Sequence, residues 1–267
     1  MALTTDLVSY YKLDENAAST AIDDAAENHD LIASGNTSAL YDATGKINSA
    51  FDFTGSYYSY TAAPWFASDG FDMTVAFWMY PTSSGTYDIW ISQSPGAAHD
   101  WFIATTGSKL RVTVVNTAGT RKDCNSASNI IFNQWNYVVA KVSNTNNTVK
   151  AWVNNVSFID TTFVGTNRGD SGYSMVSSYR KSTANSSHGQ TDEVGVWSRC
   201  ITTAEATSLY NSGNGLAYPF STGTNCKINI GDTFKDVSEF KINIGDDWKA
   251  VTKVQQNIGD SWKTVFG

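Results

Sequence analysis

The sequence HGQTDEVGVWSRCITTAEATSLY, residues 188–210, carries the strongest structural signal in the chain. Two adjacent carboxylates, Asp192 and Glu193, lead into an alternating apolar run, which is typical of a half-buried strand. Thr202 then precedes a short helical pattern as its N-cap, with Glu205 three residues later. The stretch therefore predicts a β-strand followed at once by a short capped helix.

Strand-like patterns recur along the rest of the chain, separated by turns rich in Gly, Ser and Asn. The alternating run FDFTGSYYSY, residues 51–60, predicts one half-buried strand, and the apolar residues 73–80 predict a central strand. Residues 135–142 and 149–153 flank an Asn-rich turn and predict a hairpin. Frequent strands with few long helical patterns predict an all-β fold, a two-sheet antiparallel sandwich.

Several of these segments, in this order, resemble the laminin-G-like domains of the concanavalin A-like lectin and glucanase class. The D-E-V-x-x-W strand and T-x-x-E-x-x-x-L-Y helix of residues 188–210 are similar to the closing motif of those domains. The upstream segments that carry the resemblance are LVSYYKLDE (7–15), GKINSAFDFTG (45–55), FDMTVAFWM (71–79), NQWNYVVA (133–140) and VKAWVNN (149–155). The resemblance covers about residues 5–220 and implies a jelly-roll sandwich.

An acidic loop near the N-terminus indicates a candidate cation site. Residues 22–31, IDDAAENHDL, place several carboxylates in one loop, which suits a hard cation such as Ca²⁺. The laminin-G-like resemblance implies that a loop aspartate and the aspartate of the D-E motif share this metal, and by position these are Asp23 and Asp192. The S-G-N-G loop of the family is AAEN here, without glycines. A solvated acidic loop is the alternative.

Carbohydrate binding in this class implies rim loops with exposed aromatic side chains that stack on sugar faces. The candidates here are Trp65, which follows Pro64 in a loop, Tyr58, and His99 beside Asp100. For Trp65 the alternative role is to cap the sandwich. The other tryptophans at strand positions are expected in the core: Trp78, Trp135, Trp152 and Trp197.

The class also contains glycoside hydrolases, so catalytic carboxylates have to be considered. Laminarinase-like hydrolases place E-x-D-x-x-E on one strand, where alternate residues face the same cleft, and this triplet is absent from the sequence. On a regular strand the adjacent Asp192 and Glu193 point to opposite faces, which fits one cation ligand and one structural contact. We therefore expect a non-enzymatic protein, with a divergent glycosidase as the alternative.

Charge and hydropathy exclude two classes of partner. Residues 225–267 hold six lysines and six acidic residues, so the net charge of −7 belongs to the first 224 residues. This negative net charge argues against nucleic acid as a partner. No apolar window is long enough for membrane insertion. The N-terminus lacks the basic and apolar regions of a secretory signal, so we expect synthesis in a cytoplasm without that export route.

A 14-residue repeat fills the C-terminal region: KINIGDTFKDVSEF, KINIGDDWKAVTKV and QQNIGDSWKTVFG. Each unit predicts a small hairpin with a Gly-Asp turn, and one aromatic residue recurs at the same position, Phe234, Trp248 and Trp262. A single hairpin cannot bury its apolar face alone. The sequence thus predicts a sandwich at 1–218, a linker at 219–226 and three tandem hairpins at 227–267.

The repeats resemble those at the C-termini of phage tail and other virion proteins. This resemblance implies a virion structural, decoration or fibre protein, located in the virion, whose sandwich binds a glycan or the host cell surface. The repeat aromatics would then attach the chain to other virion proteins or form a homo-oligomer, for which a trimer is one candidate. A bacterial surface carbohydrate-binding protein is the alternative.

Overall fold

The computed structural model divides the chain into two compact units, Met1–Tyr218 and Pro219–Gly267. The first unit is described from residue 2 onward, with residues 20–21 as backbone only and with gaps at 16–19, 22, 26–28, 36–37, 42, 55–56, 84–86, 95–100, 170–171, 179–180 and 182–184. In the second unit, residues 219–220 and the backbone of six short strands between 227 and 266 are described.

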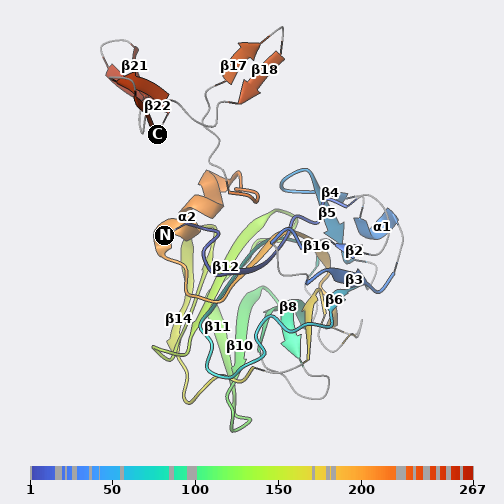
Figure 1. Ribbon diagram of the computed structural model, residues 1–267. Coiled ribbons are helices and arrows are strands. Elements are labelled where there is room, and N and C mark those ends of the chain that lie inside the picture. Colours follow the sequence, from blue (N-terminus) through green and yellow to red (C-terminus); the bar gives the residue numbers. More distant parts are fainter. Residues whose placement is uncertain are drawn as a thin grey trace. The chain divides into compact units, whose positions relative to one another are not determined.

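One eight-stranded sheet of the first unit, called here the first sheet, follows the order β14-β13-β12-β7-β16-β5-β4, and β1 also pairs with β16 (Figure 1). All of these pairings are antiparallel. The strands are β14 (Val156–Thr162), β13 (Thr148–Val153), β12 (Asn136–Ser143), β7 (Met73–Pro81), β16 (Gly189–Trp197), β5 (Ser49–Asp52), β4 (Ala43–Thr44) and β1 (Leu7–Tyr11).

The second sheet also has eight strands, in the order β11-β10-β9-β8-β15-β6-β3-β2. These pairings are antiparallel too. The strands are β11 (Arg121–Asn129), β10 (Lys109–Val115), β9 (Trp101–Thr106), β8 (Asp88–Ser94), β15 (Tyr173–Val176), β6 (Ser59–Thr61), β3 (Leu31–Ala33) and β2 (Thr20–Ala21). A four-residue helix, α1 (Ser38–Tyr41), precedes β4.

The core lies between the two sheets. Alternate residues of β7, Val75 and Phe77, share one buried cluster with alternate residues of β9, Trp101 and Ile103. This period of two is what a strand with one face on a core requires. The predicted all-β, two-sheet antiparallel sandwich is therefore confirmed.

The run at residues 51–60 is divided between the sheets, so the prediction of one continuous strand there is wrong. Its first residues belong to β5 in the first sheet, and its last residues belong to β6 in the second. In β6 the buried positions are the polar residues Ser59 and Thr61, whereas Tyr60 is half-buried. The apolar alternation of the run therefore does not mark one core-facing side, and it does not show where the chain crosses from one sheet to the other.

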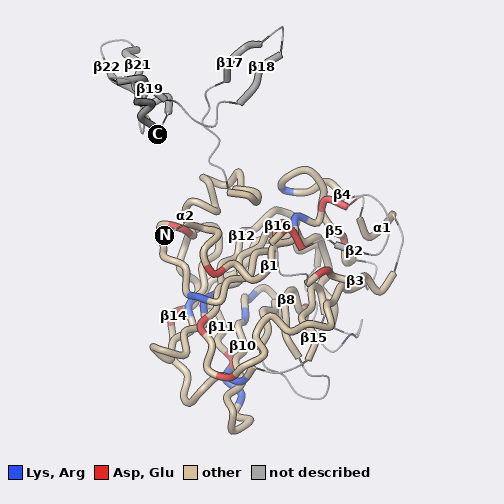
Figure 2. The backbone as a smooth tube through the Cα atoms, viewed as in Figure 1, with Lys and Arg blue, Asp and Glu red and all other residues tan. Residues whose placement is uncertain are grey.

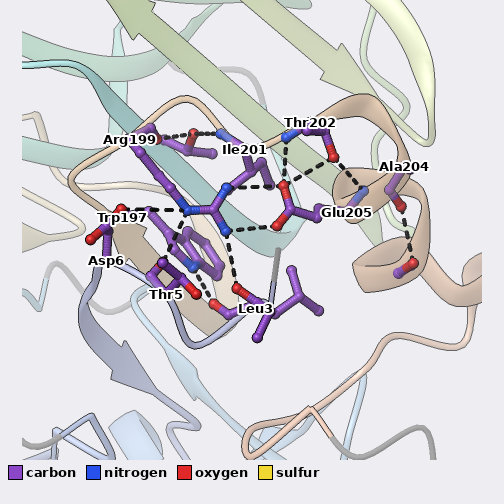
Figure 3. A network of polar contacts seen from close by, with 12 residues as sticks. Leu3, Thr5, Asp6, Trp197, Arg199, Ile201, Thr202, Ala204 and Glu205 are labelled. Carbon is purple, nitrogen blue, oxygen red and sulfur yellow. Dashed lines mark hydrogen bonds and ion pairs between the residues drawn. The ribbon is translucent and has the colours of Figure 1, made fainter.

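The predicted capped helix is confirmed as α2 (Thr203–Tyr210), which ends at the left-handed residue Asn211. Thr202 and Glu205 form a capping box, in which each side chain bonds the backbone amide of the other residue. Arg199 binds both oxygens of Glu205, at 2.9 and 2.7 Å, and donates to the carbonyl of Thr5 (Figure 3). One network thus joins the helix start to the N-terminal segment.

Helix α2 covers part of the outer face of the first sheet. The ring of Tyr210 stacks on Trp78 and Tyr137, which are directly opposite each other on β7 and β12. This cover explains why β7 is buried on both faces, with Trp78 only 2% exposed. None of the helices in the described parts of the chain is long and apolar enough to cross a membrane.

The second unit contains three two-stranded antiparallel hairpins in its described backbone. They are β17 (Lys227–Ile230) with β18 (Thr233–Asp236), β19 (Lys241–Ile244) with β20 (Asp247–Ala250), and β21 (Val254–Ile258) with β22 (Ser261–Phe266). One hairpin corresponds to each repeat unit, and β21 begins one residue before the third unit. The side chains of Phe234, Trp248 and Trp262, predicted to attach or oligomerise the chain, lie outside the described structure.

Candidate functional site

Glu193 interrupts the regular pairing of β16 with β7. The register shifts between Asp192, which is opposite Trp78, and Gly195. Glu193 has a φ of 51°, a left-handed conformation that costs a non-glycine residue roughly 1 kcal/mol or more. The extra residue reverses the alternation of the strand, as β-bulges do. Asp192 therefore shares the outer face of the sheet with Trp78, although Val194, two residues on, lies in the core.

Both carboxylates lie on this outer face, so the prediction that they point to opposite faces is wrong. Glu193 Oε2 accepts a hydrogen bond from the hydroxyl of Tyr10, a residue opposite Gly195 on β1. Asp192 Oδ2 accepts one from the amide of Ile47 at 2.9 Å. The remaining oxygens, Asp192 Oδ1 and Glu193 Oε1, are buried and have no hydrogen-bond partner in the described part of the chain.

Burial controls the electrostatics of this pair. The pKa of Asp192 is raised to about 9, mainly by desolvation and further by the charges of Glu193 and Asp14. Desolvation also raises the pKa of Glu193 to about 8. Both acidic and basic residues lie in the segments around β16 (Figure 2). The charges of Asp14 and Asp24 raise the pKa of Glu193 further, and that of Lys12 lowers it. At 0% and 4% exposure both side chains are buried, and their two unpaired oxygens need a partner that the described residues do not supply, such as a proton, a cation or an ordered water.

Asp23, the other predicted metal ligand, is held by backbone amides. Its Oδ1 accepts hydrogen bonds from Tyr10 at 2.9 Å and Ala25 at 3.0 Å, and its Oδ2 accepts one from His29 at 3.2 Å. Asp23 and Asp192 thus have separate hydrogen-bond partners. Among the described residues no three His, Cys, Asp or Glu side chains are placed to hold a metal ion. Calcium at Asp23 and Asp192 remains a prediction.

The three predicted sugar-binding residues have different positions. Trp65 is 5% exposed, stacks on Trp101 and donates its indole N–H to the Tyr11 hydroxyl at 3.1 Å. It is therefore a core residue rather than an exposed rim platform, because it fills the space between the sheets. Tyr58 is half-buried beside Tyr60. His99 lies outside the described residues.

Tyr58 belongs to a surface group that we call the tyrosine–lysine cluster: Tyr58, Tyr60, Tyr173 and Lys181. The rings of Tyr60 and Tyr173 meet edge to face at 5.6 Å, and Tyr58 lies 6.2 Å from Tyr60. The Lys181 ammonium is 3.9 Å from the centre of the Tyr60 ring and 4.5 Å from that of Tyr173. All four residues are partly exposed.

The strand register places this cluster on the outer face of the second sheet. Tyr60 is opposite Met175 on β15 and opposite Ile32 on β3, and Ile32 is 48% exposed. Directly opposite residues share a face, and Tyr173, two residues before Met175, shares it as well. Of this group, only Tyr58 was predicted from the sequence as an exposed aromatic candidate. No sequence pattern indicated that Tyr60, Tyr173 and Lys181 would lie beside it.

Three solved structures illustrate the similarity of fold. Domain 4 of AbnA, a GH43 extracellular arabinanase from Geobacillus stearothermophilus solved with arabinotriose, has a TM-score of 0.60 at 17% identity, covering 76% of this chain and 97% of that domain. The binding domain of Paraclostridial Mosquitocidal Protein 1 has a TM-score of 0.61 at 12% identity, with coverages of 98% and 74%.

The receptor-binding domain of botulinum neurotoxin mosaic serotype C/D has a TM-score of 0.59 at 10% identity. The match covers 79% of this chain and 51% of that domain, so this chain spans about half of its length. At such identities the likeness shows the fold alone. No curated protein matches the sequence significantly.

A family model of laminin-G-like type, described as the concanavalin A-like lectin/glucanases superfamily, matches residues 52–207. The matched range is more than half of the chain and runs from the end of β5 into α2. The laminin-G-like resemblance is therefore confirmed over this range. The chain belongs to the concanavalin A-like lectin/glucanases superfamily.

Proposed function

We propose that this chain is a non-catalytic glycan-binding protein of a virion, which binds a glycan or the host surface through its sandwich and is attached through its C-terminal repeats. The observation that carries the binding role is the tyrosine–lysine cluster. It offers aromatic rings beside an ammonium group on the outer face of the second sheet.

The chemistry of the cluster suits a sugar. Aromatic side chains offer flat apolar surfaces with a polar hydroxyl at one end, and a sugar ring has both an apolar face and hydroxyl groups. Lys181 is attracted to the faces of both Tyr60 and Tyr173 and holds them together by cation–π contact. An ammonium has three N–H donors, so the same group can donate to sugar hydroxyls at the edge of the rings.

The comparisons support binding in a general way. AbnA domain 4 was solved in complex with arabinotriose, and the neurotoxin domain is a receptor-binding domain. Burial of Asp192 and Glu193 supports the non-catalytic part of the proposal, because carboxylates that cannot touch a substrate cannot act as acid or nucleophile in glycoside hydrolysis.

The virion part of the proposal is supported by the sequence of the repeats and by the hairpins of the second unit. Three tandem hairpins with one aromatic each, at Phe234, Trp248 and Trp262, are too small to form a stable core singly. Association of these units, between chains or with another virion protein, would bury that apolar surface.

Glycan binding is tested with a glycan array, followed by calorimetric titration of the best ligand. Replacing Tyr60→Ala or Tyr173→Ala is expected to weaken binding about tenfold or more, since a stacking ring is lost. Tyr80→Ala is the matched control, because Tyr80 is a half-buried tyrosine that packs on Trp135 in the first sheet. Equal losses in all three variants would contradict the assignment of the site.

Attachment through the repeats is tested by size-exclusion chromatography with light scattering. The full chain is compared with a version that ends at Phe220. A full-length trimer and a monomeric truncation support assembly through the repeats, whereas the same oligomer for both contradicts it. Release of reducing sugars from a polysaccharide panel, lost on Asp192→Asn and Glu193→Gln, would instead support the glycosidase alternative.

A further inference from the structure

A polar pocket lies on the first sheet, whereas the tyrosine–lysine cluster lies on the second. It has a volume of 270 Å³ and is formed by neighbouring residues of β12 and β13 together with the segment that enters α2. We call it the two-lysine pocket. The residues used in the argument are Lys141, Lys150, Trp152, Thr148 and Thr203.

The register of the β12–β13 hairpin sets the chemistry of this pocket. Lys141 and Lys150 are directly opposite each other, and their strand neighbours Ala140 and Ala151 are fully buried in the sandwich. Alternation therefore directs both lysines to the outer face of the sheet. Like charges directly opposite on a sheet are destabilising, so this pair needs compensation from an anion or from another partner.

The protein compensates the two lysines unequally. Lys150 forms an ion pair with Asp160 at 3.2 Å, and the Asp160 side chain is 63% exposed, so solvent weakens this pair. Lys141 is partly buried, donates to the carbonyl of Ile201 at 2.8 Å and lies 4.3 Å from the centre of the Trp152 ring. No ion pair to Lys141 is formed by a carboxylate in the described portion of the chain.

The walls of the pocket add groups that suit a sugar. Trp152 was expected in the core, and that prediction is wrong: it is half-buried and presents indole surface on the outer face, because it alternates with the core residues Ala151 and Val153. Thr148 and Thr203 line the pocket, and within the described residues their hydroxyls form no hydrogen bond. The pocket thus combines positive charge, an aromatic surface and free hydroxyl groups in a protein whose overall charge is −7.

We propose that the two-lysine pocket binds an acidic saccharide, with its carboxylate or sulfate group between Lys141 and Lys150 and its ring against Trp152. An anion there would relieve the repulsion of the facing lysines and gain charge-assisted hydrogen bonds. Packing of the sugar ring on the Trp152 indole would make an acidic saccharide bind more tightly than a free anion. This inference extends the proposed glycan-binding role to a second site and a class of acidic ligand.

The experiment is a calorimetric titration of the full chain with four probes: a sulfated oligosaccharide, an oligogalacturonate, a neutral oligogalactose and sodium sulfate. Binding of either acidic oligosaccharide at least about tenfold tighter than the neutral one supports the proposal, and the tighter of the two identifies sulfate or carboxylate. Added salt should weaken this binding. Equal affinity for sodium sulfate and the acidic oligosaccharides overturns it, because the saccharide then contributes nothing.

Variants locate the site. Lys141→Gln and Lys150→Gln are each expected to weaken acidic binding about tenfold or more, whereas Lys122→Gln, at an exposed lysine of β11, should not. Equal losses in all three would overturn the proposal by showing nonspecific attraction. If thermal unfolding shows that Lys141→Gln does not fold, the affinity of Lys150→Gln for the acidic saccharide tests the site by itself.

Tyr60→Ala separates this inference from the proposed function. One outcome is that the unaltered protein shows no preference for acidic saccharides and that Tyr60→Ala loses neutral-glycan binding. This outcome overturns the two-lysine pocket as a binding site and leaves the proposal for the tyrosine–lysine cluster in place. The other outcome is that Lys141→Gln removes the binding of acidic saccharides and Tyr60→Ala leaves it unchanged. This outcome supports the two-lysine pocket, whether or not the tyrosine–lysine cluster binds a glycan.

Discussion

Asp192→Asn is expected to change how the stability of this protein depends on pH. Burial raises the pKa of Asp192 to about 9 and that of Glu193 to about 8, whereas such groups in an unfolded chain titrate near pH 4. Between these values the folded protein holds protons that the unfolded chain has lost. Stability is therefore highest at the acidic end of this window and falls as pH rises.

The magnitude follows from the number of protons. Each group that is protonated in the folded state and ionised in the unfolded state lowers the free energy of unfolding by about 1.4 kcal/mol per pH unit. Asp192 and Glu193 together thus give a slope of up to about 2.7 kcal/mol per unit between about pH 5 and pH 8. Asp192→Asn removes one of these protons and should halve the slope.

The assay is urea unfolding followed by tryptophan fluorescence at several values between about pH 5 and pH 8, in the presence of a chelator. Asp160→Asn is the matched control, because its side chain is 63% exposed and should leave the slope unchanged. A stability that is flat or rises across this range would refute the reasoning, since both carboxyls would then be ionised in the folded protein.

The same titration tests calcium. A Ca²⁺ ion bound to Asp192 requires the ionised carboxylate, so binding replaces the proton and favours higher pH. If added calcium raises stability near pH 8 in the unaltered protein and not in Asp192→Asn, the result supports Asp192 as a ligand of the predicted calcium site. If calcium has no effect at any pH, protons alone satisfy the free oxygens and the calcium prediction fails.

Two further substitutions test the framework of the sandwich. Glu205→Gln should lower the free energy of unfolding by about 3 kcal/mol at neutral pH, because hydrogen bonds from Arg199 hold the pKa of Glu205 at about 2. This stabilisation is present above about pH 4.5 and disappears as pH falls towards 2, so the two proteins should converge in acid unfolding curves. Gly195→Ala should cost about 1–3 kcal/mol in urea unfolding, since a Cβ there would overlap the buried ring of Trp197, and an unchanged midpoint would contradict this.

Much of the fold could be predicted because its signals are local. The capping pair Thr202 and Glu205 determines where α2 begins through bonds within one turn. The Asn-rich turn after β12 determines which residues of the hairpin are opposite each other. The pairing of Lys141 with Lys150 therefore follows from the sequence of this hairpin alone. Such features depend on residues that are close in the chain, and sequence patterns record them well.

The site residues depend on contacts that no local pattern records. Tyr173 is far from Tyr60 in the chain, and the two meet only because β15 pairs with β6. The bulge at Glu193 gives no composition signal, yet it places Asp192 and Glu193 on the same face. Trp65 follows a proline in what reads as an exposed loop, but it fills the core beside Trp101.

The positions of the carboxylates and the aromatic residues together determine where a ligand can bind. The closing strand buries Asp192 and Glu193, so this pair of carboxylates has little surface to offer a sugar. The partly exposed aromatic residues that lie next to lysines are on the outer faces instead, at Tyr60 on the second sheet and Trp152 on the first.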